Sequence, residues 1–71
     1  MSKMVVEKAG YYVDTWFCGN KTHVITTLAS LLTSRSIGAR IQYNHILEKF
    51  IEQDSDLALT IIDRVNHKIH G

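Results

Sequence analysis

Cys18 and His23 are the nucleophile and base that lie closest together in this sequence, and their chemistry would be catalysis by an activated thiolate. They are five residues apart, across a segment containing Gly19 and Asn20 that is typical of a turn. This spacing sets no geometry, and no neighbouring residue orients the imidazole. We therefore interpret Cys18 as a partly buried structural thiol, and we predict that the chain is not an enzyme.

Carboxylates form the second group of residues that could take part in catalysis or metal binding. Four acidic residues lie close together in the sequence and could bind a metal ion or act as an acid–base pair: Glu48, Glu52, Asp54 and Asp56. We interpret them instead as the solvated end of one helix and the cap of the next. The four glycines are isolated and form no phosphate-binding loop. We therefore expect no metal, no cofactor and no small-molecule substrate.

Histidines are numerous, with four in 71 residues. His67 and His70 are three residues apart and share one face of a helix, whereas His45 lies elsewhere. Two ligands on a fraying C-terminal turn make a weak metal site. We interpret the histidines as surface residues. A pH-sensitive surface is the alternative, because protonation of all four would raise the net charge from +1 towards +5.

The elements that position these residues are indicated by apolar periodicity. Apolar residues keep helical spacing in the range 43–51 and again in the range 57–69. The polar residues between the two ranges predict a tight turn, with Asp54 or Ser55 as the cap of the last helix. The C-terminal part of the chain is thus predicted to be a helical hairpin.

The first third of the chain has two interpretations. Apolar residues at helical spacing from Val5 through Ala9 to Phe17, followed by Gly19, favour a helix that ends there. The ranges 11–17 and 22–27 are also rich in β-branched and aromatic residues, so they could form a β-hairpin. Pairing these two arms mixes polar and apolar side chains on each face. We therefore favour the helix and keep the hairpin as the alternative.

Serine and glycine residues separate the second helix from the third. We expect Gly38 to adopt a left-handed conformation in this linker, Ser36 to cap the third helix, and Asn20 or Thr22 to cap the second. The predicted fold is all-α: one domain over residues 1–71, with three to four short amphipathic helices and a C-terminal helical hairpin. The four predicted helices lie near residues 4–17, 22–34, 39–53 and 55–69.

Chain length and composition predict self-association. A chain of 71 residues buries a small core, yet 45% of its residues are hydrophobic. The single cysteine cannot form an intrachain disulfide. We therefore predict a homodimer that acts as a regulatory or adaptor protein through protein–protein contacts. The residues predicted to lie at the dimer or partner interface are Trp16, Phe17, Ile46, Phe50, Ile61 and Val65.

The N-terminal residues Met1–Glu7 lack the long apolar stretch of a signal peptide. No segment of the sequence approaches the roughly 20 apolar residues that span a bilayer. An unpaired cysteine is typical of a reducing compartment. We therefore expect a cytoplasmic protein without membrane contact.

DNA binding is the alternative function. The predicted helices and the polar turn between them outline a helix-turn-helix over residues 22–53. A net charge of +1 gives little electrostatic attraction for nucleic acid. Glu48 and Glu52, in the predicted helix at 39–53, would also repel phosphate. The predicted contacts to phosphates and bases are Lys21, Arg35, Arg40, Gln42 and Asn44.

A series of short patterns carries a resemblance to a known family: Ala9-Gly10 followed by Trp16-Phe17, then Leu28 to Leu32, then Ser34 to Ile37, then Ile46-Leu47 with Ile51-Glu52 and Ser55-Asp56. Over residues 9 to about 66, the chain resembles the small enterobacterial biofilm-development and acid-resistance connector proteins, the YmgB/AriR-like family. The resemblance implies an all-helical protein that dimerises through its helical hairpin. It also implies a role in biofilm or stress-response regulation, through contacts with two-component signalling proteins or with DNA. The stretch between Phe17 and Leu28 is shorter than in that family, and the resemblance transfers no functional residue.

Overall fold

Four α-helices make up nearly all of the described chain. The computed structural model describes the backbone of residues 3–71 and the side chains of residues 10–71. The helices are α1 (Lys3–Phe17), α2 (Lys21–Thr33), α3 (Ile37–Gln53) and α4 (Ser55–His70). The all-α prediction is confirmed, and the residues of the alternative β-hairpin are helical or lie in the α1–α2 turn. Two predicted members of the α1 stripe, Val5 and Ala9, lie outside the described side chains.

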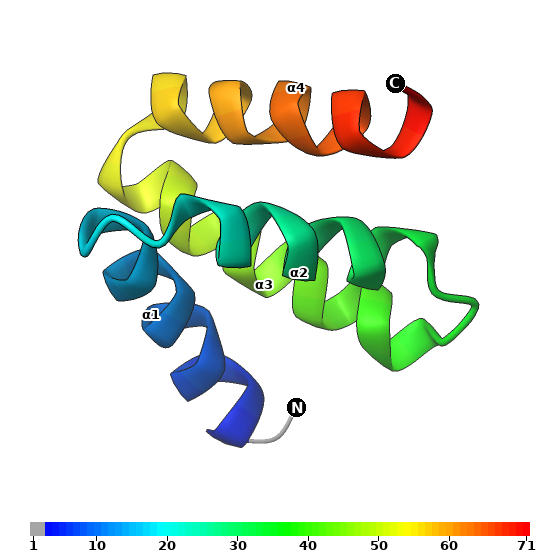
Figure 1. The fold of residues 1–71 in the computed structure, drawn as a ribbon. Coiled ribbons are helices and arrows are strands. Elements are labelled where there is room, and N and C mark those ends of the chain that lie inside the picture. Colours follow the sequence, from blue (N-terminus) through cyan, green and yellow to red (C-terminus); the bar gives the residue numbers. More distant parts are fainter. Residues whose placement is uncertain (1–2) are drawn as a thin grey trace.

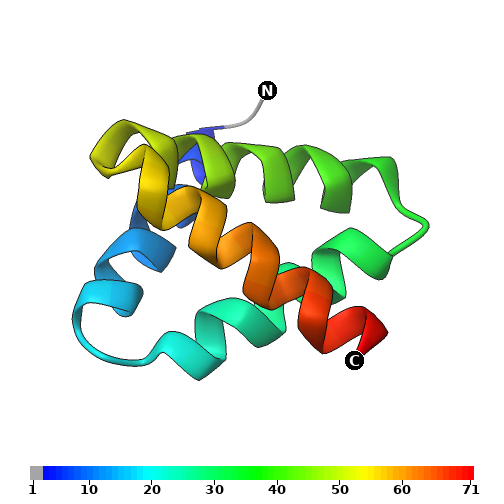
Figure 2. The same ribbon diagram turned by 90° about the horizontal axis from the view of Figure 1, so that it is seen from above.

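The helices are arranged around an antiparallel pair. Helices α2 and α3 run side by side in opposite directions in both views (Figures 1 and 2). Helix α4 crosses over one face of this pair, and α1 packs on the opposite face, where α2 begins and α3 ends (Figure 1). Both α1 and α4 therefore pack against α2 and α3.

The core lies between the central pair and the two outer helices, and all four helices contribute to it. Phe50, Ile46 and Ile61 have no exposed surface, and the rings of Phe50 and Trp16 meet edge to face with centroids 5.9 Å apart. Burial raises the pKa of the Tyr43 phenol above its ordinary value, because the charged form is poorly solvated there. The described core consists of Val13, Trp16, Val24, Ile25, Leu28, Ala29, Tyr43, Ile46, Phe50, Ala58, Ile61 and Val65.

The turn between α1 and α2 depends on a glycine. Gly19 has a φ of +101°, a conformation that side chains other than glycine disfavour. Its N–H donates a hydrogen bond to the Trp16 carbonyl (3.0 Å), which closes the last turn of α1. The prediction that Gly38 adopts the left-handed conformation is wrong. Helix α3 begins at Ile37, so Gly38 lies in its first turn with ordinary helical geometry.

The caps of the helices differ from one another. Asp54 Oδ1 accepts hydrogen bonds from the backbone N–H groups of Asp56 (3.0 Å) and Leu57 (3.3 Å), so the predicted cap of α4 is confirmed. Ser36 and Asn20 occupy the N-cap positions of α3 and α2, but neither side chain makes a capping hydrogen bond. In the polar turn after α3, the Asp54 side chain therefore has a structural role as the cap of α4.

Replacing Asp54 with alanine is expected to lower the free energy of unfolding by about 1 kcal/mol, because two N–H groups at the start of α4 lose their acceptor. Urea unfolding followed by circular dichroism measures this change. Ser36→Ala is the matched control, since it removes a residue at the same helix position whose side chain makes no capping bond. An equal loss in both variants would contradict the assigned role of the Asp54 carboxylate.

None of the helices in the described part of the chain combines the length and apolar character needed to cross a bilayer.

Candidate functional site

The predicted interface residues lie mostly in the core of a single chain. Trp16 is 4% exposed, and Ile46, Phe50, Ile61 and Val65 have no exposed surface. A partner that docks on this fold cannot touch them, so their assignment to an interface is corrected to the core. They were selected because large apolar side chains dominate interfaces, but in so short a chain the same side chains are needed for folding. Only Phe17, at 62% exposure, is available to a partner.

The predicted DNA contacts do not form one surface. Lys21 begins α2, whereas Arg35 follows the end of that helix. Arg40 and Asn44 are exposed and one turn apart on α3, while Gln42 is half-buried and points to another side of the helix. A helix-turn-helix also needs its two helices to cross steeply, at roughly 90–120°. Helices α2 and α3 instead run antiparallel (Figure 2).

The nucleophile and the acidic residues are explained locally. Cys18 is exposed, so its predicted partial burial is wrong, and the His23 ring lies 6.0 Å from that of Tyr12. Within residues 10–71, the two recorded ion pairs both lie on α3. His45 Nδ1 is 3.9 Å from Glu48 Oε2, and Lys49 Nζ is 3.4 Å from Glu52 Oε2. No group of three metal-ligating side chains gathers within the described ranges.

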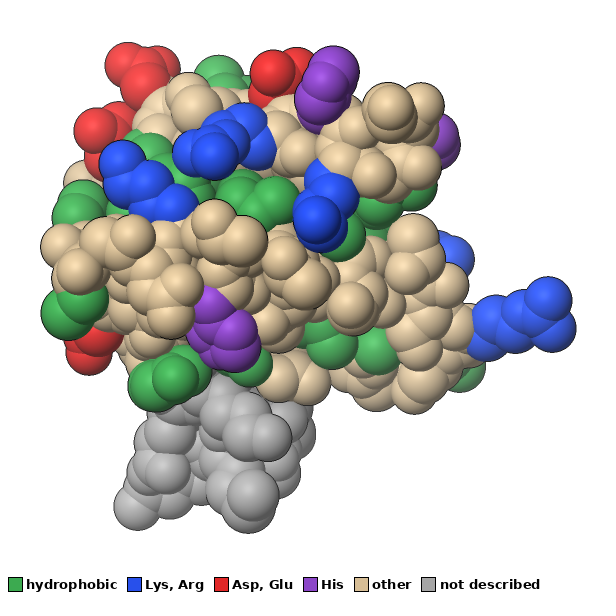
Figure 3. All heavy atoms as spheres, viewed as in Figure 1, with side chains coloured by type: hydrophobic (Ala, Val, Ile, Leu, Met, Phe, Trp, Pro, Cys, Tyr) green, Lys and Arg blue, Asp and Glu red, His purple; other side chains and the backbone are tan. Residues whose placement is uncertain are grey.

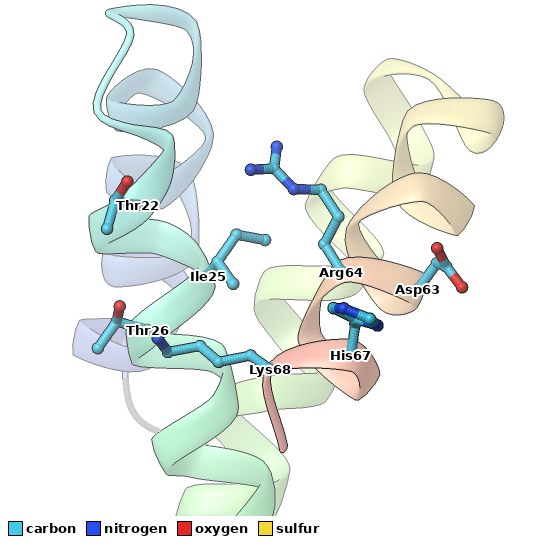
Figure 4. Close-up of a pocket in the computed structure, with 7 residues that line it drawn as sticks. All are labelled: Thr22, Ile25, Thr26, Asp63, Arg64, His67 and Lys68. Atoms are coloured by element: carbon cyan, nitrogen blue, oxygen red, sulfur yellow. The ribbon is translucent and has the colours of Figure 1, made fainter. Parts of the chain in front are cut away.

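An open groove of about 530 Å³ lies between the first half of α2 and the second half of α4. We call it the α2–α4 groove. Figure 4 shows Arg64 and Lys68 extending from α4 toward α2, while Asp63 points away from α2. The cationic groups therefore project into the groove and its only acidic lining residue does not. The groove is lined by Thr22, Ile25, Thr26, Asp63, Arg64, His67 and Lys68.

One residue of the groove wall, Arg64, also contacts the tryptophan of the core. The Arg64 guanidinium carbon lies 5.7 Å from the centroid of the Trp16 ring, and Lys21 Nζ lies 5.4 Å from the same centroid. Both distances are within the range of cation–π attraction. These side chains from α2 and α4 therefore cover the part of the indole that the core leaves open, and they connect α4 to α1.

The two groove cations, Arg64 and Lys68, and the nearby Lys21 are not paired with a carboxylate in either ion pair described above within residues 10–71. Figure 3 shows Lys and Arg side chains next to hydrophobic ones along the furrow between α4 and α2. A surface of this kind attracts negative charge, and its apolar base can exclude water from the contact. Its chemistry is recognition of an anionic group beside an apolar one.

No sequence pattern predicted this groove. Lys21 is a predicted DNA contact, and Arg64 and Lys68 are not among the predicted site residues. Arg64 and Lys68 are four residues apart, so their common position on one face of α4 was readable from the sequence. That this face lies opposite Thr22 and Thr26 depends on how α4 crosses α2.

Comparison with protein-family models, with curated proteins and with solved structures finds no match to this chain. The family resemblance stays a prediction.

Proposed function

We propose that this chain is a non-enzymatic regulatory or adaptor protein that acts as a homodimer and binds another protein through the α2–α4 groove. The observation that carries the proposal is the set of groove cations without carboxylate partners within residues 10–71, placed beside an apolar base. Charged groups around an apolar centre are the usual composition of a protein–protein interface. Arg64 also lies over the Trp16 ring, whereas Lys68 is in neither ion pair of residues 10–71; a binding role accounts for the projection of both cations into one groove.

Exposed apolar side chains support the homodimer. They include Ile37 at 78% exposure, Leu59 at 65% and Phe17 at 62%. These three residues lie on three different helices, so a second copy would cover a subset of them, and in a chain with so small a core even that adds buried apolar surface. Light scattering at physiological salt tests this part of the proposal, with twice the chain mass as the expected result. A single chain mass at all concentrations would contradict it.

Affinity capture with three baits tests the binding function. The baits are the wild-type chain, the groove variant Arg64→Glu with Lys68→Glu, and the control variant Arg35→Glu with Arg40→Glu. We expect the wild type and the control to retain the same partner from a lysate of the native cells. The groove variant should lose it by about tenfold or more, because like charges at an interface are strongly unfavourable.

The control makes this experiment specific. It reverses the same number of positive charges at exposed positions of the α2–α3 loop and of α3, outside the residues that line the groove. Circular dichroism checks that each bait keeps its helices. If the groove variant retains the partner as well as the wild type does, the groove is not the binding site. If only the Arg35 and Arg40 variant loses its partner, the binding surface lies on the opposite end of α2.

A further inference from the structure

We propose that the occupant of the α2–α4 groove is an acidic amphipathic helix of a partner protein, with two carboxylates one helical turn apart beside an apolar side chain. This inference rests on the proposed function and adds the chemistry of the partner. Three observations carry it: the spacing of the cations, the side chains on the opposite wall, and the apolar base of the groove.

The cations on α4 have the spacing of a helical turn. Arg64 and Lys68 are four residues apart on one helix, and both extend toward α2 (Figure 4). Side chains at this separation have Cβ atoms about 5–6 Å apart, and the same holds for positions i and i+4 of an incoming helix. Two carboxylates one turn apart would therefore each meet a cation. The planar guanidinium of Arg64 can also bind a carboxylate through two parallel hydrogen bonds.

The wall on α2 supplies hydroxyl groups with the same spacing. Thr15, Thr33 and Thr60 each donate a hydrogen bond to a backbone carbonyl of their own helix. Thr22 and Thr26 have no such bond recorded among the described residues, although they too are helical and exposed. Their hydroxyls are thus available as donors to a carboxylate, and their methyl groups offer apolar contact.

The base of the groove is apolar. Ile25 lines it between the two threonines of α2, and Figure 4 shows its side chain directed toward α4. Insertion of an amphipathic helix between two helices is a common recognition mode that uses such a base. Ile25 is 6% exposed, so an apolar side chain of the ligand would lie over the small part of Ile25 that the core leaves uncovered and against the methyl groups of Thr22 and Thr26. Its carboxylates would reach the two cations of α4.

Charge distribution favours a protein segment over nucleic acid. A nucleic-acid surface needs a continuous basic stripe, whereas this chain has a net charge of +1 and the Lys and Arg residues that line the groove are Arg64 and Lys68, with Asp63 adjacent. A ligand with few charges and an apolar side chain matches this arrangement better than a phosphate backbone does. Binding to a DNA duplex is therefore made an outcome of the test.

Trp16 provides a reporter for occupancy of the groove. It is the only tryptophan in the chain, and Arg64 lies over its ring. A ligand carboxylate that pairs with Arg64 changes the electric field at the indole, so its emission should shift when the groove fills. The signal requires no label, and the groove variant serves as its reference.

The experiment titrates the intact chain with three short, alanine-rich helical peptides. The first carries Glu at positions i and i+4 and Leu at i+3. The second has Gln in place of both Glu residues, and the third has the same composition as the first with the two Glu residues on opposite faces. We expect the first peptide to shift Trp16 emission, with an affinity that weakens as salt rises. The second and third should bind at least about tenfold more weakly.

Matched variants locate the binding. Arg64→Glu with Lys68→Glu should lose the first peptide, and Arg35→Glu with Arg40→Glu should keep it. The milder pair Arg64→Gln with Lys68→Gln should also lose it. This variant serves as the test if the charge-reversed chain fails to fold. Replacing Thr22 and Thr26 with valine should weaken binding a few-fold, because the valines keep the shape and remove the donors.

Four results would overturn the inference. If none of the peptides binds while the groove variant still loses its captured partner, the adaptor function stands and the acidic helix is wrong. If a short DNA duplex binds in the groove more tightly than the first peptide, the occupant is nucleic acid. If Arg64→Glu with Lys68→Glu converts a dimer into a monomer, the occupant is a second copy of this chain. If the wild-type chain binds none of the peptides and the groove variant captures the partner as well as the wild type does, the proposed function is wrong as well.

Discussion

Phe50→Asp is expected to abolish the folded state. Phe50 has no exposed surface, and its ring packs against Trp16 at the junction of α1 and α3. Loss of a buried phenylalanine costs about 3–5 kcal/mol. A carboxylate without a partner in the same place adds several kcal/mol more. A chain of this size has a total stability of about 4–11 kcal/mol, so the sum of the two penalties is of the same size or larger.

Circular dichroism and thermal unfolding measure this result, and the expected outcome is loss of helical signal without a cooperative transition. Ile51→Asp is the matched control. It introduces the same side chain one position later, where the native residue is 49% exposed. The control should unfold close to the wild type. A folded Phe50→Asp chain would show that α3 presents a different face to the core.

Trp16→Ala is expected to lower the free energy of unfolding by about 3–5 kcal/mol, the range for truncating a large buried aromatic side chain. The residue is 4% exposed and joins three helices, through the Phe50 ring on α3 and the Arg64 side chain on α4. Its loss leaves a cavity in the core and removes the ring under two cations. The effect should therefore be among the largest of any single truncation within residues 10–17 of α1.

Urea unfolding followed by circular dichroism measures the change, since the variant has no tryptophan emission. The neighbouring Phe17→Ala is the control, because Phe17 is 62% exposed and its loss should change stability by less than about 0.5 kcal/mol. If Phe17→Ala destabilised the monomer more than Trp16→Ala did, α1 would have to pack with a different face. If Phe17→Ala weakened only the dimer, that would locate part of the dimer interface at the end of α1.

The helices and their ends were largely predictable because they depend on local sequence. The apolar period of α4 is strong, and its buried residues Ala58, Ile61 and Val65 belong to the face that the spacing predicts. Asp54 was predictable as a cap for the same reason, because its hydrogen bonds reach residues only two and three positions away. The start of α3 was less predictable, since a glycine and two serines at its N-terminus resemble a longer linker.

The division between buried and exposed apolar residues near the helix ends was not predictable in this way. Trp16 and Phe17 are adjacent and similar in type, yet one is core and the other is surface. Their difference follows from the direction in which α1 crosses α3, which periodicity does not specify. Ile51 shows the same problem at the end of α3: it ends the range 43–51, in which apolar residues keep the spacing of one helix face, yet it is half exposed.

By itself the sequence favoured the all-α class over a β-hairpin in its first third, and it predicted the α4 cap and the apolar face of α4, because these depend on contacts between residues close in the chain. The tertiary structure alone decided that α4 crosses α2, so that Arg64 and Lys68 face Thr22 and Thr26 across a groove. The residues of the two walls are about 40 positions apart in the chain. Only the packing of the helices around one core sets the separation and direction of side chains so distant in sequence.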